Sequence, residues 1–181
     1  MNNLSTTAHC LVKNEARFIW YSVMSIYNYV DKILLWDTGS TDGTLEIIQE
    51  ILKEDKENKI DFRKYEGINV SNFWKARQEM LNQTETDWFI VIDGDEVWWQ
   101  DSIRHLVSEI QRNGKSYESI IVPTYNLVGD IFHYQETQAG KYKFGKLRGH
   151  YNLRGVSKNI PGLHSFGEHG MWGWVDSENK M

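Results

Sequence analysis

Apolar and polar positions follow two patterns that alternate through the first two thirds of the chain. Short apolar runs, typical of buried strands, occur at residues 8–13, 32–37, 60–65, 87–92 and 119–125. Between them, apolar residues recur at helical spacing within residues 19–30, 45–52, 73–81 and 103–110. Asn14, Ser71 and Asp101 precede three of these segments as expected N-caps, and Gly114 follows the last. This order predicts an α/β fold with a mostly parallel sheet flanked by helices.

The run at residues 87–92 is expected at the centre of the sheet. Residues 60–65 predict a weaker strand nearer an edge, and Pro123 favours an edge or a bulge because it lacks an N–H group. After Asn126, glycines recur and basic residues cluster among scattered aromatics. This change predicts short strands and loops. We therefore expect a single domain over residues 1–181, with a βα part at 1–125 and a short irregular part at 126–181.

Composition narrows the class of protein. The chain has 181 residues, enough for one domain with a sizeable core, and a formal net charge of -5. No long basic run is present, so nucleic acid is not an expected partner. The single cysteine, Cys10, allows no intramolecular disulfide and fits a reducing compartment. The sequence has no signal-peptide pattern and no apolar run near ~20 residues, so we expect a cytoplasmic protein without a transmembrane segment.

Two acidic residues come directly after the most apolar run. Asp93 and Asp95 are separated only by Gly94, and a buried parallel strand delivers its last residues to the crevice where open α/β sheets bind ligands. Two carboxylates this close repel each other, and a hard divalent cation such as Mg²⁺ or Mn²⁺ relieves the repulsion. Gly94 leaves room for a ligand near the backbone. The alternative is an ordinary turn after a strand.

Two further segments carry ligand-binding chemistry. Asp37 ends the second apolar run, and the small, glycine-containing residues 38–44 lead into a helix, so that backbone N–H groups face a ligand. An ordinary βα loop with capping residues has the same pattern, and no P-loop lysine follows. Arg77, early in the third helix, fits an inward-facing arginine that grips a diphosphate. A surface arginine is the alternative.

These segments, in this order, resemble the family 2 glycosyltransferases with the GT-A (Rossmann-like) fold. The resemblance rests on residues 12–15, 30–44, 72–78 and 87–96, and it covers roughly residues 7–125. Two of these segments are similar to sequences of the bacterial branch of the family, which acts on lipopolysaccharide or other surface glycans. They are Lys-Asn-Glu at residues 13–15 and Asp-Thr-Gly-Ser-Thr-Asp-Gly-Thr at residues 37–44. Many members carry a second aspartate where this chain has Thr38.

The resemblance implies that residues 1–125 bind a nucleotide-sugar donor. It implies a base and ribose site lined by Val12, Lys13, Asn14, Glu15, Asp37 and Thr38. Arg77 would lie by the nucleotide. Asp93, Gly94 and Asp95 match the family's DXD motif, with Asp95 on Mn²⁺ or Mg²⁺ and Asp93 on the ribose or a metal-bound water. The metal would neutralise the leaving diphosphate, a general base would deprotonate the acceptor hydroxyl, and the sugar carbon would be inverted.

Residues 126–181 would then form the acceptor side and supply the base. The candidate carboxylates there are Asp130, Glu136, Glu168 and Asp176. The segment at 162–165 resembles a Gly-Val-His-Glu sequence of related transferases, with Ser165 where the glutamate would be. Glu168 is the expected substitute, and His164 is a candidate further metal ligand. A surface or hydrogen-bonded role is the alternative for this histidine.

Aromatic and basic residues suggest how an acceptor is held. Four tryptophans could stack on sugar faces or belong to the core: Trp98, Trp99, Trp172 and Trp174. Six basic residues could meet an anionic saccharide or lipid-linked acceptor, with peripheral membrane contact, or could form a solvated loop: Lys141, Lys143, Lys146, Arg148, Arg154 and Lys158. The sequence does not decide between these alternatives.

Two other functions fit parts of the sequence. Residues 92–97 also fit the Asp-x-Asp signature of haloacid-dehalogenase-type phosphatases, in which the first aspartate is a nucleophile. That signature normally ends the first strand of its domain, whereas here about 90 residues of βα pattern precede it. A non-catalytic or fragmentary nucleotide- or glycan-binding domain is the other alternative, because the acceptor half is short.

Overall fold

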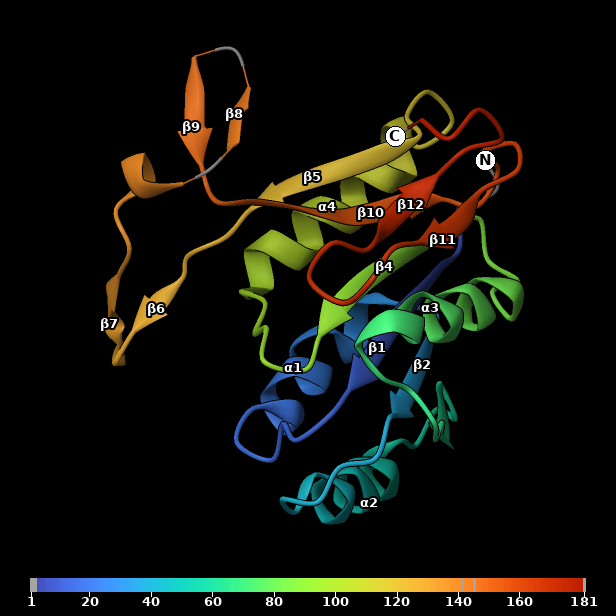
Figure 1. Ribbon diagram of the computed structural model, residues 1–181, viewed down its shortest axis with the longest axis vertical. Helices are drawn as coiled ribbons and strands as arrows, with labels where there is room; N and C mark the ends of the chain where they lie inside the picture. Colours follow the sequence, from blue (N-terminus) through green and yellow to red (C-terminus); the bar gives the residue numbers. More distant parts are fainter. Residues whose placement is uncertain (1–2, 141, 145, 181) are drawn as a thin grey trace.

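The centre of the protein is a six-stranded sheet in the order β3-β2-β1-β4-β10-β5 (Figure 1). The computed structural model describes residues 3–140, 142–144 and 146–180 of the chain. Four neighbouring strands are parallel: β3 (Ile60–Lys64), β2 (Lys32–Asp37), β1 (Thr6–Val12) and β4 (Trp88–Asp93). β10 (Tyr151–Ser157) runs antiparallel to both β4 and β5 (Ser119–Pro123). The predicted α/β fold is confirmed, with β3 and β5 at the two edges as expected.

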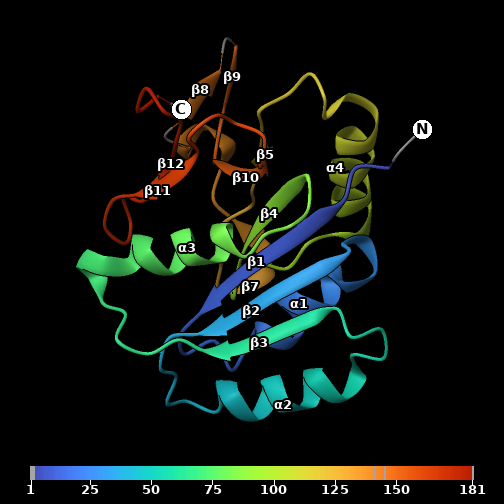
Figure 2. The same ribbon diagram turned by 90° about the vertical axis from the view of Figure 1, so that its right-hand side faces the viewer.

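Helices cover both faces of this sheet (Figure 2). On one face lie α1 (Ile19–Ile26), α2 (Thr44–Glu54) and α4 (Gln100–Asn113). On the other face lies α3 (Phe73–Asn82). Short 3-10 turns are η1 (Tyr27–Tyr29), η2 (Val70–Asn72) and η3 (Thr137–Ala139).

Alternation along the strands explains why both faces are covered. In β1, Ala8, Cys10 and Val12 pack toward the three-helix face, whereas Leu11 packs toward α3. β4 alternates in the same way, because Ile90 packs toward the three-helix face, whereas Phe89 and Val91 pack in a separate cluster that includes Leu81 of α3. Side chains that point alternately to two covered faces produce the continuous apolar runs seen in the sequence. Cys10 is buried in this core, and burial raises the pKa of its thiol to about 12, so it packs as a small apolar residue.

The C-terminal part consists of short strands, as expected, with one exception. Three hairpins are formed by β6 (Leu127–Val128) with β7 (Asp130–Tyr134), β8 (Tyr142–Phe144) with β9 (Leu147–Gly149), and β11 (His164–Phe166) with β12 (Gly173–Val175). The first two project from the body, and β11 packs beside α3 (Figure 1). The exception is β10, which enters the central sheet between β4 and β5 and was not predicted there.

Asn14 is not the N-cap that the sequence predicted. It has a left-handed backbone with φ of 59°, and α1 starts five residues later at Ile19. The Asn14 side chain instead accepts the N–H of Thr41 at 2.8 Å, and the N–H of Asn14 donates to Ser40 Oγ at 2.8 Å. Asparagine tolerates this conformation better than most residues. Asn14 therefore ties the loop after β1 to the loop after β2.

Two other predicted caps are shifted by a few residues. Asn69, not Ser71, caps the turn before α3, because its side chain accepts the N–H groups of Ser71 and Asn72. Asp101 lies inside the first turn of α4, where a carboxylate still favours the positive end of the helix. Gly114 follows α4, as predicted. Capping residues cluster at helix starts, so sequence alone locates them only to within a turn.

His9 is a buried titratable group in β1. Its Nε2 lies 2.6 Å from Thr84 Oγ1, and its ring stacks on Phe89 with centroids 4.5 Å apart. Burial lowers its pKa well below 6.5, and the positive charges of Arg77 and Lys158 lower it further. The folded chain therefore holds His9 neutral under conditions in which the unfolded chain would protonate it.

We predict that His9 makes the fold acid-sensitive. As the pH falls below about 6.5, the unfolded state binds a proton that the folded state does not, so the free energy of unfolding decreases. His9 is expected to lower the free energy of unfolding by up to about 1.4 kcal/mol for each pH unit, until the pH reaches the pKa of His9 in the folded state. Above about pH 7 this effect vanishes. Urea unfolding of the wild type and of His9→Gln between pH 5 and pH 8 would measure it, with a smaller pH slope expected for the variant.

The matched control is His105→Gln, which removes an exposed histidine of α4. This variant should keep the wild-type slope. Other groups that titrate in this range are common to all three proteins and cancel in the comparison. Equal slopes for wild type and His9→Gln would contradict the prediction.

Candidate active site

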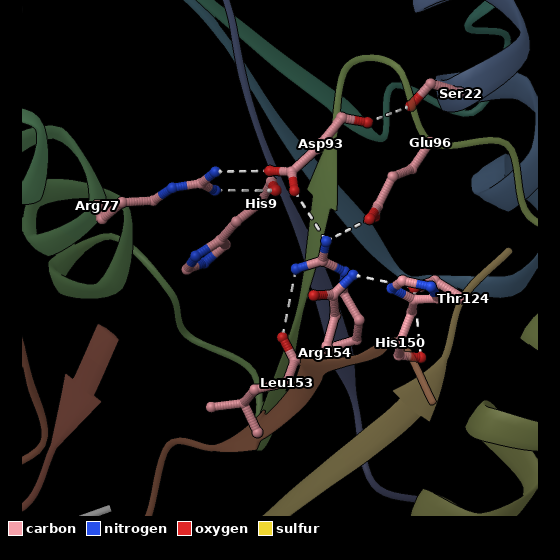
Figure 3. Close-up of polar contacts among 10 residues, drawn as sticks. His9, Ser22, Arg77, Asp93, Glu96, Thr124, His150, Leu153 and Arg154 are labelled. Carbon is pink, nitrogen blue, oxygen red and sulfur yellow. Dashed lines mark hydrogen bonds and ion pairs between the residues drawn. The ribbon is translucent and has the colours of Figure 1, made fainter. Parts of the chain in front are cut away.

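The Asp93 carboxylate, at the carboxyl end of β4, lies between two buried arginines (Figure 3). Arg77 Nη2, from α3, donates to Asp93 Oδ1 at 3.2 Å, and Arg154 Nη2, from β10, donates to Oδ2 at 2.8 Å. The Arg77 and Arg154 side chains are 1% and 7% exposed, whereas Asp93 is 39% exposed. Hydrogen bonds between opposite charges are short and directional. The two guanidinium groups therefore fix the orientation of a carboxylate that still reaches solvent.

Arg77 points inward, as expected, but contacts the protein itself. Its Nη1 donates to the carbonyl of His9 at 3.4 Å, and its guanidinium lies over the Trp172 and Phe73 rings, 4.6 and 5.5 Å from their centroids. Burial lowers its pKa, and the negative charge of Asp93 opposes that shift. The arginine predicted to grip a diphosphate thus holds Asp93 in place.

Arg154 is the main residue that the sequence analysis misplaced. It was grouped with basic residues of a loop or an anionic contact surface, but it is buried in β10. The pairing of β10 with β5 shifts register between Leu153 and Gly155, so Arg154 is the extra residue of a bulge. Bulges re-aim side chains. Here the bulge accompanies an arginine that reaches Asp93 on the neighbouring strand.

Glu96 completes a charge-balanced network. Arg154 Nη2 contacts Glu96 Oε1 as well as Asp93, and the N–H of Glu96 donates to the carbonyl of Asp93 at 3.1 Å. Ser22 Oγ donates to the same carbonyl at 2.9 Å. Burial raises the pKa of Glu96, and the charge of Arg154 opposes the shift. Two carboxylates and two guanidinium groups leave this half-buried cluster without net charge.

Asp95 and Gly94 lie on the other side of Asp93, against the loop after β1. A Cβ at Gly94 would come within 2.7 Å of Glu15 Cγ and 2.9 Å of Val12 Cγ1, so the close approach requires glycine. Asp95 itself is exposed. Burial raises the pKa of Glu15, and the charges of Asp95 and Asp42 raise it further. The carboxylate of Glu15 therefore feels the charges of Asp95, in the loop after β4, and of Asp42, in the loop after β2.

Only one carboxylate oxygen of Asp37 accepts hydrogen bonds from the described residues. Its Oδ1 accepts the N–H groups of Gly39 and Ser40 at 2.9 and 3.0 Å. Its Oδ2 is buried and has no hydrogen-bond partner among the described residues. Thr38, in contrast, uses its hydroxyl to donate to the carbonyl of Val12 at 3.0 Å. Asp37 is therefore suited to accept a ligand N–H or O–H, while Thr38 joins two strands.

Strand register brings the predicted donor-side residues to one edge. Asp37 pairs with Val12, and Asp93 pairs with Leu11, so the ends of β2, β1 and β4 are adjacent. Lys13 and Asn14 are exposed at the same edge, immediately after β1. The sequence prediction that these segments meet is consistent with this arrangement.

His164 and Glu168 do not join this group. His164 Nδ1 lies 2.9 Å from the carbonyl of Gly162, and Glu168 is exposed in the β11–β12 turn. Within the described part of the chain, no group of three or more His, Cys, Asp or Glu side chains is placed to hold a metal ion. The structure therefore does not assemble His164, Asp93 and Asp95 into a three-ligand site. The functions of His164 and Glu168 stay predictions.

The other candidate bases have mainly local roles. Asp130 Oδ1 accepts the N–H groups of Phe132 and His133, and Asp176 Oδ1 accepts two N–H groups of the C-terminal turn. Glu136 is exposed before η3. The contacts of Asp130 and Asp176 therefore stabilise turns of the C-terminal part.

The four tryptophans divide between core and surface. Trp98 packs against the main core and Trp174 is buried, as the core interpretation predicts. Trp172 covers the guanidinium of Arg77. Trp99 is 66% exposed and lies 5.4 Å from the ring of Tyr125.

The basic residues also divide. Lys143, Lys146 and Arg148 are exposed, and Lys158 is half-buried. Lys141 lies outside the described residues. The set therefore combines surface charges with one buried arginine and does not form a single solvated loop.

The acidic groups fit a divalent cation that is shared with a substrate. Both oxygens of Asp93 are engaged by arginines, whereas Asp95 is exposed, and its charge raises the pKa of Glu15. Magnesium is often held by one or two carboxylates together with substrate phosphates, without an all-protein cage. Asp95 is therefore the residue that fits a direct metal ligand. Asp93, neutralised by its arginines, fits a positioning role.

Several solved structures share this fold. Residues 1–349 of Staphylococcus aureus TarS superpose with a TM-score of 0.56 at 15% identity, covering 86% of this chain and 47% of that one. The same fragment in complex with UDP superposes with a TM-score of 0.52 at 16% identity, covering 75% of this chain and 39% of that one. The mannosyltransferase PcManGT from Pyrobaculum calidifontis, in complex with GDP-Man and Mn²⁺, superposes with a TM-score of 0.54 at 17% identity. The match covers 68% of this chain and 36% of that one. At these identities the likeness establishes the fold.

This chain spans about half, or less, of the length of these proteins. No curated protein matches the chain in sequence. The profile described as "Glycosyl transferase family 2" matches residues 10–166, which include all six strands of the central sheet except the first residues of β1. The chain therefore belongs to glycosyl transferase family 2.

Proposed function

We propose that this chain transfers a sugar from a nucleotide-sugar donor to an acceptor hydroxyl, with inversion at the sugar carbon. The observation that carries the proposal is the edge formed by β2, β1 and β4. It combines an uncommitted buried oxygen of Asp37, the exposed carboxylate of Asp95 and the fixed carboxylate of Asp93. A nucleoside diphosphate would fit these groups together with a divalent cation, because its base or ribose can donate to Asp37 and the cation would join its phosphates to Asp95.

The donor binds with its nucleoside over β1 and β2. Asp37 Oδ2 accepts an N–H of the base or a hydroxyl of the ribose, because a buried acceptor gains most from a ligand donor. Val12, Lys13, Asn14 and Glu15 form the adjacent wall, since they end β1 or follow it. UDP and GDP-Man are bound by two of the structurally similar proteins, which supports a nucleotide ligand here.

In this arrangement Asp95 lies beside the diphosphate of the donor. A bound Mn²⁺ or Mg²⁺ would supply charge neutralisation to the departing diphosphate. Asp95 would hold this cation, and Asp93 would hold the ribose or a metal-bound water in the orientation that Arg77 and Arg154 impose. The Mn²⁺ in the PcManGT complex supports this part of the proposal.

The acceptor hydroxyl loses its proton to a carboxylate of the C-terminal part. Glu168 is the proposed base because it is exposed, and its neighbour His169 packs on Phe73 at the start of α3. Direct displacement by the deprotonated oxygen inverts the sugar carbon.

The proposed setting is cytoplasmic synthesis of a cell-surface glycan, with a saccharide or lipid-linked acceptor. Among the helices of the described chain, none combines the length and apolar character needed to cross a bilayer. The phosphatase alternative is weaker, because both oxygens of Asp93 are paired with arginines and so are poorly placed for nucleophilic attack. A binding domain without catalysis would use the same donor contacts.

Donor binding can be tested by thermal shift. UDP, GDP, CMP and dTDP, and their sugars, would be added with and without Mn²⁺. A ligand at about 100 times its dissociation constant stabilises the fold by about 2.7 kcal/mol. A metal-dependent shift with one nucleotide, followed by sugar transfer or hydrolysis, would support the proposal. Nucleotide binding without any turnover would favour the binding-domain alternative.

We predict that Asp95→Asn lowers sugar transfer by at least about a hundredfold, because it removes the proposed metal ligand. The fold should be unchanged or slightly more stable, since the substitution reduces repulsion with Glu15. Turnover at saturating Mn²⁺ and a melting curve would measure the two effects. Asp101→Asn, at an exposed position of α4, is the control and should keep the wild-type rate of sugar transfer. Wild-type turnover in Asp95→Asn would refute the metal role.

We predict that Arg154→Met destabilises the fold by about 2–4 kcal/mol, because it leaves Glu96 half-buried without its cation. Adding Glu96→Gln should recover part of the loss, and both variants should transfer sugar more slowly because Asp93 is less well oriented. Urea unfolding and turnover would measure these effects. Arg104→Met removes an exposed arginine on α4 and should change stability by less than about 0.5 kcal/mol. Equal stabilities of Arg154→Met and Arg104→Met would contradict the prediction.

A further inference from the structure

Exposed apolar side chains gather on the β6–β7 hairpin, which projects from the body beyond the end of β5 (Figure 1). Leu127 and Val128 of β6 are each 55% exposed, and Ile131 and Phe132 of β7 are 73% and 80% exposed. Single exposed apolar side chains are normal in proteins, whereas a group of them marks an interaction surface. The hairpin is therefore a candidate contact surface.

Both faces of this hairpin are apolar. Successive residues of a strand point to opposite faces, and here the exposed apolar residues are consecutive, at 127–128 in β6 and 131–132 in β7. A protein surface that packs on one face of a two-stranded ribbon leaves the other face in water. The interface of a lipid bilayer surrounds an inserted segment on all sides and would bury both faces. The distribution of apolar residues therefore favours a membrane over a protein partner.

Aromatic rings connect the hairpin to the loop after β4. The ring centroid of Tyr134 lies 5.0 Å from that of Tyr125, which lies 5.4 Å from that of Trp99. All three side chains are more than half exposed. Tryptophan and tyrosine are enriched where hydrocarbon meets lipid headgroups, because they combine an apolar ring with a polar group. The three rings therefore extend a membrane-compatible surface from the hairpin to the loop that carries Asp95.

The neighbouring β8–β9 hairpin supplies positive charge. Residues 140–149 contain four basic side chains and no acidic one, in a chain with a net charge of -5. Lys143, Lys146 and Arg148 are exposed, and this hairpin projects from the same side of the body as β6–β7 (Figure 1). Basic side chains beside a membrane are attracted to anionic lipid headgroups. Apolar and basic groups on one side of the molecule thus complement an anionic bilayer surface.

Asp130, at the turn of the β6–β7 hairpin, limits how deeply this hairpin can enter a bilayer. Its Oδ1 accepts the N–H groups of Phe132 and His133 at 2.8 and 3.1 Å and lies 2.7 Å from His133 Nδ1. These partners satisfy the carboxylate locally, but a charge and open strand edges are costly in hydrocarbon. The hairpin therefore suits a shallow position at the boundary between headgroups and acyl chains.

We propose that the β6–β7 and β8–β9 hairpins dock this protein on the surface of an anionic lipid bilayer. Ile131 and Phe132 enter the interface, and Lys143 and Lys146 contact the headgroups. Docking would bring the loop after β4 close to a lipid-linked acceptor, and this consequence alone rests on the proposed function. Docking itself can be measured without donor or acceptor.

Co-sedimentation with vesicles, without nucleotide or sugar, tests the docking. We expect at least about tenfold tighter binding to vesicles of equal parts phosphatidylcholine and phosphatidylglycerol than to phosphatidylcholine alone. Ile131→Ser/Phe132→Ser should weaken binding to the anionic vesicles by at least about tenfold, because two buried apolar side chains are lost. The matched control is Val70→Ser/Met171→Ser, which removes side chains that are 61% and 83% exposed outside both hairpins. It should bind as the wild type does.

A second pair of variants tests the charge. Lys143→Gln/Lys146→Gln should weaken binding to the anionic vesicles by about tenfold or more, because each lysine near the surface adds attraction. Lys53→Gln/Lys56→Gln changes the net charge of the chain equally, at exposed positions in and just after α2, and should keep the wild-type affinity. All substituted side chains are exposed, so melting curves close to that of the wild type are expected and would show that each variant is folded.

Absence of vesicle binding by the wild type, or wild-type affinity in either hairpin variant, would overturn the proposal. Sedimentation velocity without vesicles addresses a protein partner. Self-association that Ile131→Ser/Phe132→Ser abolishes, with no vesicle binding, would assign the hairpin to contact with a second copy and also overturn the proposal. Docking with the expected pattern of variants, but without nucleotide binding in the thermal-shift experiment, would keep the membrane surface and reject the proposed function.

Discussion

The charge balance around Asp93 controls how the site is built. A carboxylate at the end of a buried strand is held by arginines from α3 and β10, which come from segments far apart in the sequence. Each arginine is too deeply buried to be stable without a counter-charge. The same ion pairs therefore position Asp93 and join α3 and β10 to the central strand. Neutralisation of Asp93 leaves Asp95 as the accessible negative charge.

The two halves predicted from the chain are not separate in space. β10 belongs to the second part of the sequence, yet it lies between β4 and β5 of the first part. The sheet edge therefore presents the ends of β2, β1 and β4 on one side of Asp93. On the other side lies a cavity lined by residues of β10 and by the rings of Trp172 and Trp174.

Local patterns in the sequence identified much of this arrangement. The apolar run of β4 and the acids after it predicted both a central strand and a site, because parallel strands end at the same edge. The position of Arg154 depends on a bulge and on long-range antiparallel pairing, which no local periodicity reports. The apolar neighbours Leu153 and Val156 were the available signal that this arginine differs from exposed basic residues. Asn14 was misplaced because asparagine suits both caps and left-handed turns.

The late position of β10 in the chain affects how the protein is made. Until residues 151–157 have left the ribosome, one edge of β4 is unpaired and Asp93 has only one of its two arginines. Unpaired edges of apolar strands promote association between incomplete chains. Completion of this edge of the sheet is thus coupled to the synthesis of residues 151–157. A nascent chain that already contains every βα unit would still lack a properly formed site.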